Sequence, residues 1–148
     1  LSLMAICDLA IACKSATFTS AYTKVGLSPD GSSTYFLQRL INRRRLMELY
    51  LTNRVLNSNE ALEWGLINKV VDDNLLEEET SKLALSLANG PTLAYSSVKK
   101  LLNETWTETL ETQMERETIE IAKMTQTQDA QNGIKSFVNK KKPIFSGR

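Results

Sequence analysis

The chain has 148 residues, of which 42% are hydrophobic and 24% are charged, as expected for one folded domain or part of one. Eighteen basic and seventeen acidic residues leave a net charge of +1, and no stretch approaches the ~20 apolar residues of a membrane-spanning helix. We therefore expect no nucleic-acid partner, no membrane partner, and a location in the cytoplasm or, in a eukaryote, an organelle matrix.

Residues 1–72 are predicted to mix short helices with short strands. The end of a helix is expected in residues 1–7, and two short strands within the alternating, Ala- and Thr-rich residues 8–21. The sequence SPDG at residues 28–31 fits a type I turn. Ser32 or Ser33 can then cap a helix.

Residues 43–53 predict another short helix, and its first turn holds three arginines. Cations are unfavourable at the N-terminal end of a helix, so we expect an anionic partner there, such as phosphate or an acidic side chain. Ser58 is predicted to cap the next helix, which Gly65 ends, and residues 66–71 are predicted as the third strand.

Residues 73–148 are predicted to be helical. Asn74 and Glu77 fit a capping box for the first helix, and Thr107 and Asp129 are predicted as the N-caps of the last two helices. The chain is therefore expected to be mostly helical, with two parts, residues 1–72 and residues 73–148.

The chain contains no histidine, which excludes Ser-His and Cys-His nucleophilic pairs. Cys7 and Cys13 lack the paired spacing of a zinc site. We interpret them as reduced, buried thiols and expect no metal. A carboxylate is then a natural acid/base, and Asp30, between Pro29 and Gly31, is either a turn residue or that group.

Four segments, in order and at matching spacing, resemble motifs of the crotonase (enoyl-CoA hydratase/isomerase) superfamily. They are CDLAIACKSATF, VGLSPDGSSTYFLQRL, LTNRVLNSNEALEWGLINKVV and TQDAQNGIKSFVNKKKPIFSGR. The resemblance implies an α/β fold in which residues 1–72 are the last part of a ββα spiral, with its active-site loop. Residues 73–148 would form a C-terminal helical trimerisation region.

The resemblance also implies that the chain is roughly the second half of such a domain. Turns of the spiral, with the backbone donors of an oxyanion hole, would come before Leu1. We therefore expect the isolated chain to be inactive, because oxyanion-hole donors contribute strongly to this kind of catalysis.

An acyl-CoA thioester is the substrate that the resemblance implies, with no separate cofactor, since coenzyme A is part of the substrate. The two glutamates of hydratases would fall at Ser2 and Tyr22. Asp30 falls where the double-bond-shifting isomerases carry a catalytic Glu or Asp. We therefore expect an enoyl-CoA isomerase, in which Asp30 removes a proton from C2 of a 3-enoyl thioester and returns it at C4.

Three alternatives remain open from the sequence. A 4-chlorobenzoyl-CoA dehalogenase-like enzyme would carry its nucleophilic Asp in the same loop, but with a tryptophan where this chain has Tyr22. Ring-epoxide isomerases that act on phenylacetyl-CoA derivatives share the Pro-Asp pattern. A scaffolding protein that keeps the fold without catalysis belongs to another class, and the presence of Asp30 argues against it.

Asp30 would have to be desolvated to act both as a base and as an acid near neutrality. Leu27, Tyr35 and Phe36 could form an apolar wall around it, and Tyr22 could also line the site. Such residues are also common in ordinary hydrophobic cores.

The resemblance places the adenosine end of coenzyme A near the last helix. Lys140, Lys141 and Lys142 could therefore contact its 3′-phosphate, or they could be a solvated basic tail. Phe137 could cap the acyl pocket of a neighbouring subunit, or it could be buried in the core. The resemblance also implies a homo-oligomer, either a trimer or a dimer of trimers.

Overall fold

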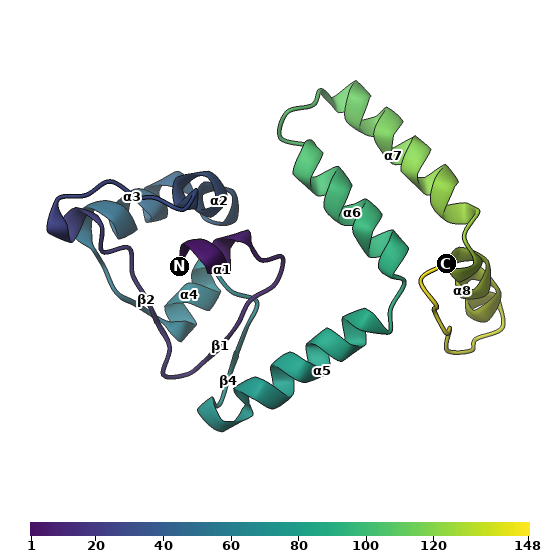
Figure 1. Cartoon of the computed structure of the whole chain (residues 1–148), viewed down its shortest axis with the longest axis horizontal. Helices are drawn as coiled ribbons and strands as arrows, with labels where there is room; N and C mark the ends of the chain where they lie inside the picture. The colour runs from purple at the N-terminus through teal and green to yellow at the C-terminus, as the bar shows by residue number, and fades with distance from the viewer. The chain divides into compact units, whose positions relative to one another are not determined.

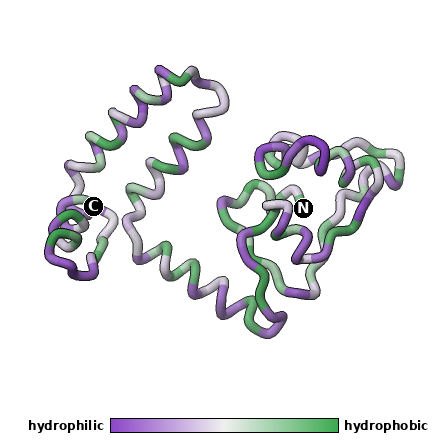
Figure 2. Tube along the Cα trace, turned by 180° about the vertical axis from the view of Figure 1, so that it is seen from behind, coloured by the Kyte–Doolittle hydropathy of each residue, from purple (hydrophilic) through white to green (hydrophobic).

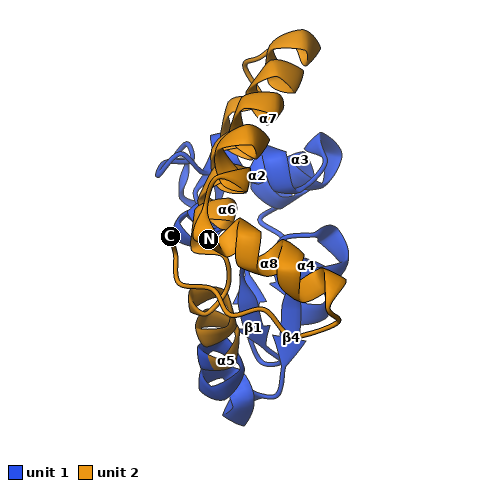
Figure 3. Cartoon of the chain, turned by 90° about the vertical axis from the view of Figure 1, so that its right-hand side faces the viewer, with its two compact units in different colours: residues 1–81 blue, residues 82–148 orange.

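The computed structural model describes residues 1–148 as two compact units, Leu1–Ser81 and Lys82–Arg148 (Figures 1 and 3). Unit 1 contains every strand, and unit 2 is helical apart from its connections and C-terminal tail. In chain order, unit 1 comprises α1 (Ser2–Ile6), β1 (Ile11–Cys13), β2 (Thr17–Phe18), the 3-10 turn η1 (Thr23–Val25), α2 (Ser33–Leu40), α3 (Arg43–Thr52), β3 (Leu56–Asn57), α4 (Ser58–Trp64), β4 (Lys69–Val71) and the 3-10 turn η2 (Asp73–Leu75).

Helix α5 (Leu76–Ala88) begins in unit 1 and ends in unit 2, so the boundary between the units lies within it. Unit 2 continues with α6 (Thr92–Glu104), α7 (Leu110–Thr125) and α8 (Gln128–Val138). No helix of the chain combines the length and the apolar character that crossing a membrane requires.

The strands of unit 1 form two separate pairs. β1 and β4 are parallel, with Ile11 opposite Lys69, and β2 and β3 are antiparallel, with Phe18 opposite Leu56. The chain between β1 and β4 provides the long crossover that a parallel pair needs. Strand β4 is shorter than predicted, because Leu66 N still donates to the Ala61 carbonyl at the end of α4.

The core of unit 1 is built where short helices meet the strands. Leu37 of α2, Leu49 of α3 and Leu56 of β3 are each 0% exposed, and burying a leucine side chain contributes about 1.5–3 kcal/mol. Tyr50 is also buried, and its hydroxyl donates a hydrogen bond of 2.8 Å to Ser33 Oγ at the start of α2. Burial raises the pKa of the Tyr50 phenol.

Asparagines cap α3, for which no cap was predicted, and α4, for which the predicted cap Ser58 is wrong. Asn42 Oδ1 accepts a bond of 3.0 Å from Arg45 N at the start of α3. Asn57 forms a capping box with Glu60 at the start of α4. Ser58, the predicted cap, is already helical, and its hydroxyl donates to the carbonyl of Lys14 instead. The predicted Asn74 cap lies inside η2.

The anionic partner predicted for the arginines at the start of α3 is present for Arg45. Arg45 makes an ion pair of 3.3 Å with Glu63, and its guanidinium lies 5.1 Å from the centre of the Trp64 ring. Arg54, beyond the end of α3, contacts the same ring at 5.2 Å and pairs with both Glu48 and Glu60. These pairs link α3 to α4, although partly exposed ion pairs stabilise a fold only modestly.

Cys7 and Cys13 are both free thiols. The expected burial is wrong for Cys7, which is exposed, and Cys13 is half-buried. Cys7 follows a helix of one turn and its side chain points away from the core, toward the carbonyl of Leu3.

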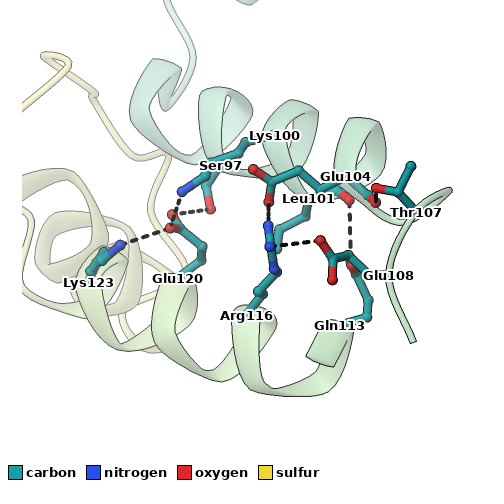
Figure 4. Close-up of polar contacts among 10 residues, drawn as sticks. All are labelled: Ser97, Lys100, Leu101, Glu104, Thr107, Glu108, Gln113, Arg116, Glu120 and Lys123. Carbon is teal, nitrogen blue, oxygen red and sulfur yellow. Dashed lines mark hydrogen bonds and ion pairs between the residues drawn. The ribbon is translucent and has the colours of Figure 1, made fainter. Parts of the chain in front are cut away.

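In unit 2, polar side chains join α6 to α7 along their length (Figure 4). Glu120 accepts hydrogen bonds from Ser97 (3.0 Å), Lys100 (3.0 Å) and Lys123 (2.9 Å). Arg116 pairs with Glu104 at 2.5 Å. Hydrophobic and hydrophilic residues alternate along both helices in Figure 2. The buried residues of α6 and α7 are Ser97 and Glu120, and apolar side chains such as Leu102 (62%) and Ile121 (64%) stay exposed.

The N-caps of α7 and α8 also differ from the predicted ones. Thr109 Oγ1 accepts from Thr112 N at the start of α7, whereas Thr107, the predicted cap, donates to the carbonyl of Glu104. Thr127 caps α8. Asp129, the predicted cap, lies one residue inside that helix.

The side chain of Asp129 holds the C-terminal tail instead. Its carboxylate accepts from Ser146 N at 2.7 Å and from Gly147 N at 2.8 Å. These backbone bonds lower the pKa of the Asp129 carboxyl. The tail after α8 is thereby tied back to the first turn of the helix.

Glu120 should make the stability of unit 2 sensitive to acid. Its hydrogen bonds to Lys123, Lys100 and Ser97 lower its pKa from 4.5 to about 2. A carboxyl with a lowered pKa stabilises the fold fully above its unfolded pKa, and this contribution is lost as the pH falls from about 4.5 toward 2.

We expect Glu120→Gln to be less stable than wild type near neutral pH and to approach wild-type stability in acid. Urea unfolding measured along a pH series tests this, with Glu115→Gln, an exposed carboxylate of the same helix, as the matched control. Curves for wild type and Glu120→Gln that stay parallel over the whole series would show that the Glu120 cluster does not set acid stability.

Candidate active site

Asp30 lies on the loop between η1 and α2, and the first part of this loop is held by Tyr22. The carbonyl of Tyr22 accepts hydrogen bonds from Val25 N (3.1 Å) and Leu27 N (3.0 Å). Gly26, with φ 76°, takes the left-handed conformation that closes η1. The backbone therefore folds back on Tyr22 before it reaches Asp30.

The side chain of Asn53 and the carbonyl of Tyr50, which the sequence did not single out for this role, hold η1 by hydrogen bonds. Asn53, left-handed at φ 53° after α3, accepts at Oδ1 from Thr23 Oγ1 (3.0 Å) and Lys24 N (3.1 Å). Thr23 also donates to the carbonyl of Tyr50. An asparagine at the left-handed end of a helix is the sequence signal that could have pointed to this contact.

The turn that presents Asp30 differs from the predicted one. Instead of a type I turn over residues 28–31, a turn spans residues 30–33, in which Ser33 N donates to the Asp30 carbonyl at 3.1 Å. Both central residues have positive φ, 59° at Gly31 and 58° at Ser32. Ser32 occupies the N-cap position of α2 but makes no side-chain cap, because its backbone is left-handed rather than extended.

The side chain of Asp30 contacts Tyr22, which in turn contacts Ser2. The hydroxyl of Tyr22 donates a hydrogen bond of 2.6 Å to Asp30 Oδ1, a length typical of a hydroxyl bound to an ionised carboxylate. Ser2 Oγ, on the first turn of α1, lies 3.4 Å from the same hydroxyl. We call Ser2, Tyr22 and Asp30 the carboxylate cluster.

Gly31 allows α1 to approach this loop closely. A Cβ atom at Gly31 would lie 3.1 Å from Ser2 Cβ and 3.3 Å from Ser2 Oγ. The position therefore combines a left-handed backbone with little room for a side chain.

The apolar residues near Asp30 do not enclose it within this chain. Asp30 is exposed, and Leu27 is 62% exposed. Phe36 packs against the core, and the Tyr35 ring is covered by the guanidinium of Arg39, 3.5 Å from its centre. The expected desolvation of Asp30 is therefore not provided by this chain, and contact of these residues with an acyl chain stays a prediction.

The remaining predicted site residues belong to unit 2. Phe137 is 85% exposed, so the alternative in which it is buried in the core is wrong. Lys140 N and Lys141 N donate to carbonyls at the end of α8, and Lys142 lines a surface pocket of about 410 Å³. Contact of these lysines with a phosphate of coenzyme A stays a prediction.

The sequence matches the family model described as enoyl-CoA hydratase/isomerase over residues 1–148. It is 37% identical, over 141 residues, to the 1,2-epoxyphenylacetyl-CoA isomerase of Escherichia coli, covering 95% of this chain and 54% of that protein. It is 38% identical, over 111 residues, to 4-chlorobenzoyl coenzyme A dehalogenase-1 of Arthrobacter, covering 75% of this chain and 40% of that protein.

A solved structure from Mycobacterium abscessus, described as an enoyl-CoA hydratase/isomerase, superposes with a TM-score of 0.96 at 33% identity. The alignment covers 99% of this chain and 56% of that one. The fold is therefore that of a crotonase-type α/β protein, as the sequence predicted.

The chain belongs to the enoyl-CoA hydratase/isomerase family. Nearly all of this chain aligns with these relatives, and it spans about half of their length.

We expect Gly31→Ala to cost more stability than Gly26→Ala. Both glycines are left-handed, and an alanine at either position costs about 1–2 kcal/mol for the backbone alone. Only at Gly31 does the new Cβ crowd another residue, since nothing lies within 4 Å of a Cβ at Gly26. The crowding should add about 1 kcal/mol or more to the loss.

Urea unfolding of the two variants measures this difference. Ser2→Gly combined with Gly31→Ala should recover most of the additional loss, because it removes the atoms that the new Cβ meets. Equal losses for Gly26→Ala and Gly31→Ala would contradict the close approach of α1 to the loop.

Proposed function

We propose that this chain carries the acid/base of an enoyl-CoA isomerase that acts on acyl-CoA thioesters. The observation that supports this most directly is the carboxylate cluster, in which Asp30 is the single carboxylate. The other two members, Ser2 and Tyr22, have hydroxyl groups, which do not serve as general bases near neutral pH without a partner that takes their proton. A reaction that needs only one carboxylate fits this arrangement best.

Moving a double bond from C3–C4 to C2–C3 of a thioester is such a reaction. Asp30 takes a proton from C2, and the electron pair of that bond is delocalised through the thioester carbonyl as a dienolate. Asp30 then returns the proton at C4, which leaves the double bond between C2 and C3. Backbone N–H donors aimed at the thioester oxygen would stabilise the negative charge of the dienolate.

An epoxide isomerase is the second candidate, supported by the 37% identity to the relative of that name. The dehalogenase-like alternative has weaker support, because its resemblance includes a tryptophan at the position of Tyr22. A substrate panel of an aliphatic 3-enoyl-CoA, a ring-epoxide thioester and a 4-chlorobenzoyl thioester separates the three.

We propose further that catalysis requires the remaining half of the domain. The chain spans about half of the relatives it matches, and Asp30 is exposed within it. A buried, water-excluded site would therefore need additional elements over the loop. The assays below accordingly use the full-length protein that carries this chain.

Replacing Asp30 by Asn should lower kcat for conversion of a 3-enoyl-CoA to the 2-enoyl-CoA by about 10²–10⁴-fold, as expected when a general base is removed. Formation of the conjugated thioester can be followed by ultraviolet absorbance. The matched control is Asp72→Asn, which removes a carboxylate that only forms an exposed ion pair with Lys14. The wild-type protein should hydrate crotonyl-CoA poorly, because Ser2 and Tyr22 stand where hydratases carry their two glutamates.

Unchanged isomerisation by Asp30→Asn would return Asp30 to the role of a turn residue. Efficient hydration of crotonyl-CoA by the wild type would instead show that a second acid/base group acts in the site.

We propose that the helices of unit 2 carry the contacts of a homo-oligomer, a trimer or a dimer of trimers. Exposed apolar side chains support this, among them Phe137 (85% exposed), Val138 (74%) and Ile134 (60%), all on α8. Such residues are costly to leave in water over a large area.

Phe137→Asp should shift the full-length protein toward smaller species, because it places a charge in an apolar contact. Sedimentation velocity measures the distribution of species, with Gln131→Asp, an exposed polar residue of α8, as the control. A distribution that Phe137→Asp leaves unchanged would remove α8 from the proposed interface.

A further inference from the structure

The side chains of Asp30 and Tyr22 are joined by a hydrogen bond. Asp30 stands on an exposed loop between Pro29 and Gly31, where its side chain gains little from packing. The 2.6 Å hydrogen bond from the Tyr22 hydroxyl engages Oδ1. Oδ2 is then available to face a substrate.

The Tyr22 ring is itself held in place. It is half-buried and packs against the hydrophobic core of unit 1, and its carbonyl accepts two backbone hydrogen bonds from the loop it precedes. A group fixed by packing can fix a second group by a hydrogen bond, which is how rigid elements position catalytic side chains.

The direction of the hydrogen bonds in the cluster follows from its protons. A carboxylate only accepts, so the Tyr22 hydroxyl donates its single proton to Asp30. Ser2 Oγ, 3.4 Å from the phenol oxygen, can then interact with it only as a donor. The chain of donors runs from Ser2 to Tyr22 to Asp30.

We propose that Tyr22 is the positioning residue of Asp30, which orients its carboxylate toward the substrate, and that Ser2 supports the Tyr22 hydroxyl in this role. The inference rests on the proposed function, since it names how the acid/base of that site is held. A carboxylate held by a hydrogen bond samples fewer orientations than a free one. Loss of the Tyr22 hydroxyl should therefore reduce the fraction of time that Asp30 spends in the reacting geometry.

Tyr22→Phe in the full-length protein removes the hydroxyl and keeps the ring in the core. We expect kcat for isomerisation to fall about tenfold with KM changed by less than about twofold, because orientation acts on the reacting geometry rather than on binding. Ser2→Ala should produce the same changes at smaller size.

A second readout does not depend on turnover. The carboxyl ¹³C signal of Asp30, assigned by its absence in Asp30→Asn, is compared in wild type and in Tyr22→Phe at one neutral pH. Loss of the Tyr22 hydrogen bond should shift this signal, while thermal unfolding shows that the variant is folded.

The outcomes separate the two proposals. If Asp30→Asn abolishes isomerisation but Tyr22→Phe changes neither kcat nor the ¹³C signal of Asp30, Asp30 is the base and the role given to Tyr22 is wrong. If Asp30→Asn leaves isomerisation intact, the proposed function fails. A shifted ¹³C signal in Tyr22→Phe would then show that the two side chains are paired without serving this reaction, which also overturns the positioning role of Tyr22.

Discussion

The left-handed turn at Gly31 and Ser32 is the constraint on which the candidate site depends. It reverses the chain directly after Asp30, starts α2 at Ser33, and lets α1 come close enough for Ser2 to reach the cluster. A residue with a side chain at Gly31 would meet both a backbone penalty and the atoms of Ser2. The loop, α1 and α2 are therefore fitted to one another through this turn, and the carboxylate is placed as a result.

The carboxylate cluster joins an exposed side chain, Asp30, to one that is packed against the core, Tyr22. Asp30 is exposed, and a reacting group needs to be accessible, but a mobile carboxylate seldom adopts the reacting geometry. Tyr22 resolves this conflict because its ring belongs to the core while its hydroxyl reaches the loop. In the proposed function, Tyr22 therefore belongs both to the hydrophobic core of unit 1 and to the candidate site.

Much of the fold followed from local sequence patterns, since strands and helices appear where hydrophobic spacing predicted them. The caps were harder, because Asn57 and Ser58, or Thr127 and Asp129, are nearly adjacent and chemically similar. Distant partners decide between them: Ser58 bonds to Lys14, and Asp129 to the C-terminal tail. The resemblance to a family motif singled out Asp30 as a candidate. Its hydrogen bond from Tyr22 could not be predicted, because the two residues are joined by an irregular loop that has no regular spacing of side chains.

The central claim is that Asp30 removes the proton from C2 of the thioester. A 3-alkynoyl-CoA tests it directly, because deprotonation at C2 and return of the proton at C4 convert it to an electrophilic allene beside the base. After incubation with the full-length protein, peptide mass spectrometry locates the resulting adduct. The account predicts that the adduct is on Asp30 and is lost in Asp30→Asn, whereas an adduct on another carboxylate, retained in Asp30→Asn, would contradict it.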